Sequence, residues 1–141
     1  MKPEPFIDSS VFIIAKERSQ SNSAKIMELL AGREIEAVVS AKVVREVFAY
    51  FKSHYGKDIA SDYRLFIMHT CKIIEPYRIE KELAQWKNRI KEKDLEHIAT
   101  AKAVHAKFLV GFDRHFKPFP EYRTPKKFLK EIGIKERRTE Y

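Results

Sequence analysis

The stretch FIDSSVF, residues 6–12, decides how the chain begins to fold. Two apolar residues are followed by Asp8, and Ser9 and Ser10 precede a new apolar run that starts at Val11. Side chains of Asp and Ser accept hydrogen bonds from the free N–H groups at the start of a helix. The stretch therefore predicts a short buried strand that ends at Asp8 and passes directly into a helix.

The same order of strand and helix recurs along the chain. Further apolar strands are expected at residues 36–39, 71–74 and 108–111. Helices are expected from Ser23 to Gly32, after Ser40, after Gly56, over 79–90, from Asp94 to about Lys107, and from Thr124-Pro125 to Gly133. Alternation of this kind predicts an α/β fold with a parallel sheet, which binds ligands beyond the carboxyl ends of its strands.

Length and composition indicate one domain. The chain has 141 residues, of which 44% are hydrophobic, so we expect a single folded domain over residues 1–133 and a loose basic tail over 134–141. The single cysteine, Cys71, fits a reducing compartment and a packed thiol rather than a nucleophile. No apolar run approaches a membrane span and no secretory signal is recognisable, so a cytoplasmic location is expected. The 34% of charged residues, with few Asn and Gln, is typical of thermophiles.

The charge balance points to an anionic partner. Lys and Arg number 28 against 20 Asp and Glu, which gives a net charge of +8. Among the acids, only five are aspartates, at positions 8, 58, 62, 94 and 113. In a chain that mostly uses Glu, each Asp calls for a specific explanation. Asp58 and Asp62 fit an ordinary helix surface.

Four of the acids are expected at one edge of the sheet. Asp8 and Asp113 follow predicted strands, and the carboxyl ends of parallel strands share an edge. Asp94 opens the helix that leads into the 108–111 strand, and Glu46 lies at the flank of the apolar side of the helix after Ser40. Converging carboxylates repel one another unless a cation relieves them. Carboxylate oxygens without Cys or His partners suit Mg²⁺ or Mn²⁺ rather than Zn²⁺, and these ions promote phosphodiester hydrolysis.

Each acid also has a plainer explanation. Asp8 and Asp94 are ordinary helix caps, Glu46 is a solvated helix residue and Asp113 is a turn residue when each is taken alone. The two histidines on the helix from Asp94, His97 and His105, are spaced too far apart for a zinc helix and are interpreted as core-edge residues. The set of four acids carries more weight than any one member.

These stretches resemble the acidic motifs of PIN-domain ribonucleases, whose best-known small members are VapC-type toxins. The matching segments are FIDSSVF at 6–12, Glu46 after VVR, DLEHIATA at 94–101, FLVGFDRHF at 108–116 and TPKKFL at 124–129. The resemblance implies a three-layer α/β/α fold with four to five parallel strands and a Mg²⁺- or Mn²⁺-dependent endoribonuclease. It makes Asp8, Glu46, Asp94 and Asp113 the metal-site acids and Ser10 an accessory. It also implies a homodimer and, for a toxin, a protein antitoxin as partner.

Two positions depart from that pattern. Gly111 stands where many members have Thr or Ser, and His115 stands where many have a further acid. His115 is a candidate accessory residue that contacts a phosphate or a metal-bound water, and a plain turn residue is the alternative. Arg114 and Lys117 directly follow Asp113 and are the best candidates for binding the RNA substrate.

Three functions are therefore compared. The first is a metal-dependent endoribonuclease. The second is a module that keeps the fold but binds RNA or a protein without turnover, which the changes at Gly111 and His115 favour. The third is a receiver-like phosphorylation domain, which ranks low because the 71–74 strand leads into Glu75-Pro76 instead of the required Asp.

Overall fold

The computed structural model describes residues 2–141 and contains one five-stranded sheet. All its strand pairs are parallel, in the order β3-β2-β1-β4-β5. The strands are β1 (Phe6–Ile7), β2 (Ala37–Ser40), β3 (Cys71–Ile74), β4 (Leu109–Val110) and β5 (Tyr122–Arg123). Phe6 pairs with Leu109 and Ile7 with Val110, so the chain leaves β1 and β4 at the same level. This register places the residues after these two strands side by side.

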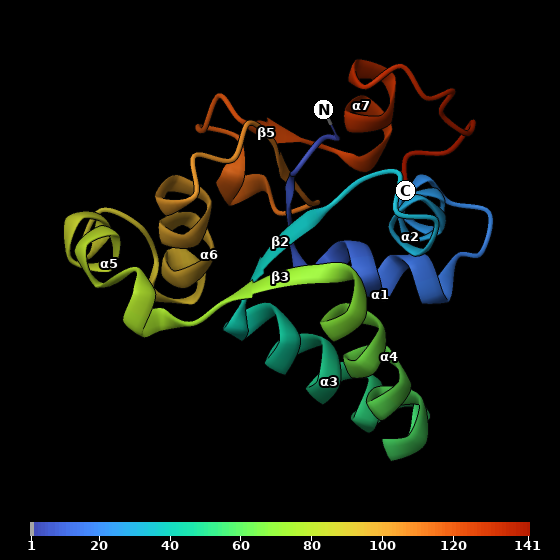
Figure 1. The fold of residues 1–141 in the computed structure, drawn as a ribbon, viewed down its shortest axis with the longest axis horizontal. Helices are drawn as coiled ribbons and strands as arrows, with labels where there is room; N and C mark the ends of the chain where they lie inside the picture. The colour runs from blue at the N-terminus through green and yellow to red at the C-terminus, as the bar shows by residue number, and fades with distance from the viewer. Residues whose placement is uncertain (1) are drawn as a thin grey trace.

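Helices cover both faces of the sheet, as a three-layer α/β/α fold requires (Figure 1). They are α1 (Ser9–Glu17), α2 (Asn22–Ala31), α3 (Ala41–Tyr55), α4 (Lys57–Thr70), α5 (Glu80–Trp86), α6 (Glu92–Ala103) and α7 (Pro125–Glu131), with short 3-10 turns η1 (Pro76–Arg78) and η2 (Arg114–Phe116). Figure 1 shows α5 and α6 on one side of the sheet and α1, α2 and α7 on the other. The α/β fold expected from the sequence is confirmed.

The central strands anchor the core. Phe6, Ile7 and Val110 are completely buried, which matches their uninterrupted apolar sequence. The helices that follow start where a capping side chain was expected: Ser40 accepts a hydrogen bond from the Val43 N–H, and Thr124 accepts one from the Lys127 N–H. These caps fix the directions in which α3 and α7 leave the sheet.

Two helix boundaries differ from the expectation. The N-cap of α2 is Ser21, whose hydroxyl accepts from the Ala24 N–H, and Ser23 lies inside the helix. The expected helix over 79–90 stops at Trp86 because Lys87 is extended and Asn88 has a φ of 68°, a left-handed conformation that Asn tolerates. Ile79 and Ile90 nevertheless pack against the core, so the apolar pattern marks burial correctly while overestimating helix length.

Helix α6 also begins and ends earlier than expected. Its N-cap is Lys91, so Asp94 is in the first turn and is not the cap. The helix ends at Ala103, and His105 is exposed with a φ of 53°, which corrects its assignment to the edge of the core. Freed from capping, the Asp94 carboxylate is available for other contacts.

Residues 134–141 are held against α2 and do not form a loose tail. The buried amide of Asn22 donates to the carbonyl oxygens of Arg137 (3.2 Å) and Thr139 (2.9 Å), and its oxygen accepts from the Arg137 N–H (2.6 Å). The Arg137 guanidinium also contacts the Glu28 carboxylate at 2.8 Å. The composition of the segment is basic, but a buried partner on α2 satisfies its backbone.

Across residues 2–141, none of the helices combines the length and apolar character that crossing a bilayer demands.

Candidate active site

Four acidic side chains meet at the carboxyl edge of the sheet. Asp8 follows β1, Asp113 comes shortly after β4, Glu46 lies on α3 and Asp94 lies in the first turn of α6. They divide into two clusters, and each contains a histidine, which corrects the expectation of carboxylates without His partners. Asp8, Glu46 and His97 form one, Asp94, Asp113 and His115 form the other, and within each the possible ligand atoms lie within 4.8 Å of one another.

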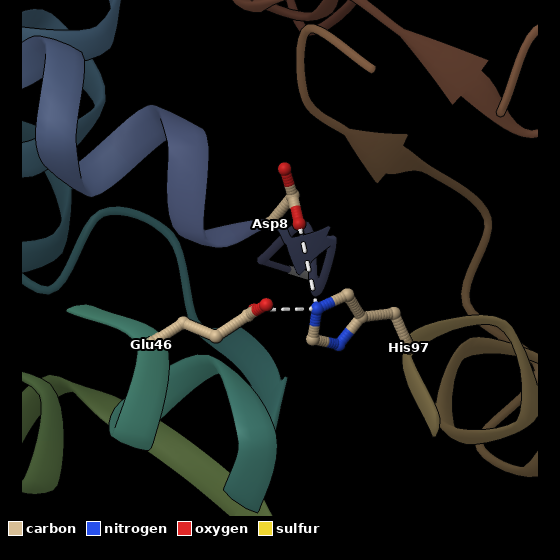
Figure 2. Close-up of side chains that lie close together, drawn as sticks. All are labelled: Asp8, Glu46 and His97. Atoms are coloured by element: carbon tan, nitrogen blue, oxygen red, sulfur yellow. Dashed lines mark hydrogen bonds and ion pairs between the residues drawn. The ribbon is translucent and has the colours of Figure 1, made fainter. Parts of the chain in front are cut away.

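His97 connects the members of the first cluster (Figure 2). Its Nε2 lies 2.8 Å from Glu46 Oε1 and 3.7 Å from Asp8 Oδ1, and its Nδ1 lies 2.8 Å from Ser40 Oγ. Ser40 Oγ already accepts the Val43 N–H, so its hydroxyl proton can go to Nδ1. The Nε2–H of His97 can then donate to Glu46 Oε1.

Two serines hold the carboxylates of this cluster. Ser10 donates to Asp8 Oδ2 from its hydroxyl (2.7 Å) and its backbone N–H (3.3 Å), and Ser9 Oγ donates to Glu46 Oε1 at 3.2 Å. Ser10 therefore contacts Asp8 directly, and its accessory role stays a prediction. Because these donors come from the first turn of α1, the strand-to-helix junction itself sets the direction of both carboxylates.

The pKa values of the two acids of the first cluster are shifted in opposite directions. Burial raises the pKa of Asp8, although His97 and the Ser10 hydrogen bonds act against that effect. Burial also acts to raise the pKa of Glu46, but the His97 hydrogen bond, the His97 charge and Lys42 outweigh it, and the pKa is lowered. Ionisation is therefore favoured at Glu46 and disfavoured by burial at Asp8.

The second cluster contains an unsatisfied carboxylate. Asp94 is 4% exposed, and its Oδ2 has no hydrogen-bond partner within residues 2–141. His115 Nδ1 lies 3.7 Å from Asp94 Oδ2 and 2.9 Å from Asp113 Oδ1. Burial and the neighbouring Asp113 charge raise the pKa of Asp94. Lys93 Nζ lies 3.8 Å from the other oxygen of Asp113.

Gly111 is required by close packing against Asp8. A Cβ at this position would lie 2.9 Å from Asp8 Cβ and 3.3 Å from Asp8 Oδ2. The two positions are neighbours because β1 and β4 pair in register and Asp8 donates its N–H to the Val110 carbonyl at 2.9 Å. The close approach of Asp8 to position 111 thus explains why no residue with a hydroxyl side chain stands there.

The donor set fits a hard divalent cation. Four carboxylates at one edge supply the oxygen ligands that such ions prefer, and the orphaned Asp94 Oδ2 is a buried acceptor without a donor. Burial raises the pKa values of Asp8 and Asp94, so ionising both carboxylates costs free energy that a bound cation would offset. The residues present are therefore suited to hold one or two cations.

The remaining candidates lie at the margin of the clusters. Arg114 and Lys117 have exposed side chains on and just after η2, so they can reach an anion in solution. His97 was interpreted from the sequence as a core-edge residue, but it is 2% exposed and is a central member of the site. Its position three residues after Asp94 places both on one helix face, and that spacing was the available signal.

Comparisons with known proteins agree with this geometry. The sequence profile described as PIN domain matches residues 5–115, and the chain belongs to this family. A toxin-antitoxin complex from Klebsiella pneumoniae contains a chain that superposes with a TM-score of 0.63 at 18% identity, covering 86% of this chain and 97% of that one. A chain of VapBC2 from Rickettsia felis bound to a promoter DNA fragment superposes with a TM-score of 0.60 at 17% identity, covering 86% of this chain and 98% of that one.

A chain of DNA-bound VapBC from Salmonella typhimurium gives a TM-score of 0.58 at 14% identity, covering 88% of this chain and 97% of that one. A search of curated proteins gave no match. At these identities the neighbours establish the fold, and the expected membership of the PIN-domain family is confirmed.

Proposed function

We propose that the protein is a metal-dependent endoribonuclease that hydrolyses RNA phosphodiester bonds. The observation that carries the proposal is the pair of clusters that contain Asp8 with Glu46 and Asp94 with Asp113 in a chain of the PIN-domain family. The unpartnered Asp94 Oδ2 within this edge supports a role in ligation rather than in folding.

Asp8, Glu46, Asp94 and Asp113 would hold Mg²⁺ or Mn²⁺. A bound divalent cation supplies activation of water and neutralisation of the charge that develops on the phosphoryl oxygens. The protein's own contribution is orientation. Ser10 fixes Asp8, and His97 and Ser9 fix Glu46, so these carboxylates are placed before substrate arrives.

Basic side chains would bind the RNA beside the acids. Arg114 and Lys117 are exposed within a few residues of Asp113, and the chain as a whole carries a net charge of +8. Phosphate contacts by such residues depend on salt, because each contact releases counterions. We therefore expect binding of RNA to weaken steeply as salt is raised.

The structural neighbours favour a toxin role. All three solved structures described above are toxin-antitoxin or VapBC complexes, which supports a protein antitoxin as partner. We also propose a homodimer, which the family resemblance implies, and a cytoplasmic location. A toxin role predicts a small antitoxin encoded beside the gene, and the test is to co-express the chain with such a neighbour. Co-purification and relief of growth arrest support the toxin role, and independent behaviour of the two proteins contradicts it.

The enzymatic test measures cleavage of a labelled single-stranded RNA with Mn²⁺ or Mg²⁺. Wild type is expected to cleave, and EDTA or Asp8→Asn is expected to abolish cleavage. Asp58→Asn, an exposed Asp on α4, is the matched control and should retain wild-type activity. Cleavage that survives both chelation and Asp8→Asn contradicts the proposal.

A binding module without turnover is the second candidate. It is favoured by the contact of Asp113 with Lys93, whose Nζ lies 3.8 Å from Asp113 Oδ2, so a protein group already provides some of the positive charge that a metal would supply. This function predicts salt-dependent RNA binding and no cleavage with any divalent cation. Metal-restored cleavage excludes it.

A further inference from the structure

We propose that His115 is a metal ligand, and that it makes this site select a first-row transition cation such as Mn²⁺ over Mg²⁺. The inference deepens the proposed function by naming the class of cation held at the same edge. It rests on the second cluster, in which the Nδ1 of His115 and the carboxylates of Asp94 and Asp113 have ligand atoms within 4.8 Å of one another.

Two buried polar atoms of this cluster make no hydrogen bond among the described residues. They are Asp94 Oδ2 and His115 Nδ1, which lie 3.7 Å apart, and the same Nδ1 lies 2.9 Å from Asp113 Oδ1 without hydrogen-bond geometry. Asp94 is 4% exposed, so water does not readily replace the missing partner. A buried acceptor and an imidazole nitrogen at this separation are suited to sharing one cation between them.

The outer nitrogen of His115 is compatible with ligation. Lys91 Nζ lies 3.3 Å from His115 Nε2 on the exposed side of the ring. When Nδ1 binds a cation, the neutral imidazole carries its proton on Nε2, and the flexible Lys91 side chain must turn away into solvent. The cost is one long, exposed hydrogen bond, so the change of partner is small.

The chemistry of the donor set then favours transition ions. Mg²⁺ binds oxygen ligands almost exclusively and gives up its water reluctantly. Imidazole nitrogen is a better ligand for first-row transition ions than for Mg²⁺. This cluster offers two carboxylates and one imidazole. Compared with an all-oxygen site, it should bind Mg²⁺ less well relative to Mn²⁺.

The test measures metal binding without RNA. Electron paramagnetic resonance follows the loss of the free Mn²⁺ signal on titration of wild type, and Mg²⁺ is then added as competitor. Electron spin-echo modulation from ¹⁴N reports whether imidazole nitrogen is bound to Mn²⁺. The variants are His115→Asp, which replaces the imidazole by an oxygen donor, and His105→Asp, an exposed histidine changed in the same way as a control.

Wild type and His105→Asp are expected to show ¹⁴N modulation and to bind Mn²⁺ at least about 10-fold more tightly than Mg²⁺. His115→Asp should lose the modulation and reduce that ratio about 10-fold. Unchanged modulation in His115→Asp would assign the nitrogen to another residue and overturn the inference, as would an unchanged ratio or an absence of Mn²⁺ binding.

The outcomes separate this inference from the proposed function. Nitrogen-ligated Mn²⁺ in a protein that cleaves no RNA contradicts the nuclease proposal and leaves His115 as a ligand. Suppose instead that wild type and His115→Asp cleave RNA equally well with Mg²⁺ and Mn²⁺ and show no ¹⁴N modulation. That result supports the nuclease proposal and contradicts ligation by His115.

Discussion

The Nε2 of His97 lies 2.8 Å from Oε1 of Glu46, although the two residues come from α6 and α3. The other ring nitrogen meets Ser40 at the end of β2, so one imidazole links a strand end to a candidate catalytic carboxylate. A pair of substitutions separates these two contacts. Gln at 97 can keep a donor near the Nε2 position, whereas Asn can replace only Nδ1.

We expect His97→Gln to retain more RNA cleavage than His97→Asn, because only Gln can still orient Glu46. The loss in His97→Asn should be about 10- to 100-fold, as for other residues that orient ligands. Both variants should lose about 1–3 kcal/mol of stability, because each leaves a buried polar group unpaired. Single-turnover rates and thermal unfolding measure the two effects. Equal activity in both variants would show that the ring acts only in packing.

Gly111→Ser should damage the site, even though it adds the hydroxyl that resembling proteins carry there. Its Cβ would lie 2.9 Å from Asp8 Cβ, closer than van der Waals contact allows, so Asp8 must move. The expected cost is about 1–3 kcal/mol in stability, with reduced Mn²⁺ affinity. Calorimetric unfolding and metal titration provide the readouts.

Gly32→Ala is the matched control for that prediction. Gly32 has a φ of −81°, and its nearest contact to an added Cβ is an ordinary 3.4 Å. We expect its stability and metal affinity to stay close to wild type. If Gly111→Ser behaves like this control, the close packing does not constrain Asp8.

Asp94→Asn should stabilise the protein at pH 7 in chelator-treated buffer. Burial raises the pKa of Asp94 above its ordinary 3.8, so the folded state holds this proton more tightly than the unfolded state does. Stability is therefore lost as pH rises through the raised value, and the substitution removes that loss. The expected gain is on the order of 1 kcal/mol.

The pH dependence and the metal response test the origin of that gain. Below the ordinary pKa of 3.8 both states are protonated, and the difference between variant and wild type should vanish. Added Mn²⁺ should raise the melting temperature of wild type more than that of Asp94→Asn. A difference that is constant with pH would point to packing instead of charge.

Asn22→Ala should release residues 134–141 from α2. The substitution removes three hydrogen bonds to the backbone of Arg137 and Thr139 and leaves those groups to water. We expect a loss of about 1–3 kcal/mol and faster amide exchange in this segment. Glu28→Gln, which removes only an exposed ion pair with Arg137, should cost at most about 1 kcal/mol.

The sequence was sufficient to predict the elements that depend on local signals. Apolar runs marked β1 and β2, and the capping residues Ser40 and Thr124 began helices where expected. The carboxyl-edge placement of Asp8 and Asp113 followed from the rule for parallel sheets. These features require only a few neighbouring residues or one general rule of topology.

Features that depend on contacts between residues far apart in the sequence could not be predicted from local sequence patterns. Strand β5 has only two residues, and Asn88 ends the extension of α5 through a left-handed backbone that no apolar pattern encodes. The docking of residues 134–141 depends on Asn22, which is more than a hundred positions away. His97 was misjudged for the same reason, because its role depends on contacts with β2 and α3.

Strands β1 and β4, which precede Asp8 and Asp113, are short, yet their side chains are almost completely buried. Phe6, Ile7 and Val110 are inaccessible to solvent, and β1 is paired on both sides. Amides in such positions exchange only when the domain opens globally. Heat inactivation should therefore coincide with cooperative unfolding of the whole protein, without an earlier stage in which the site melts alone.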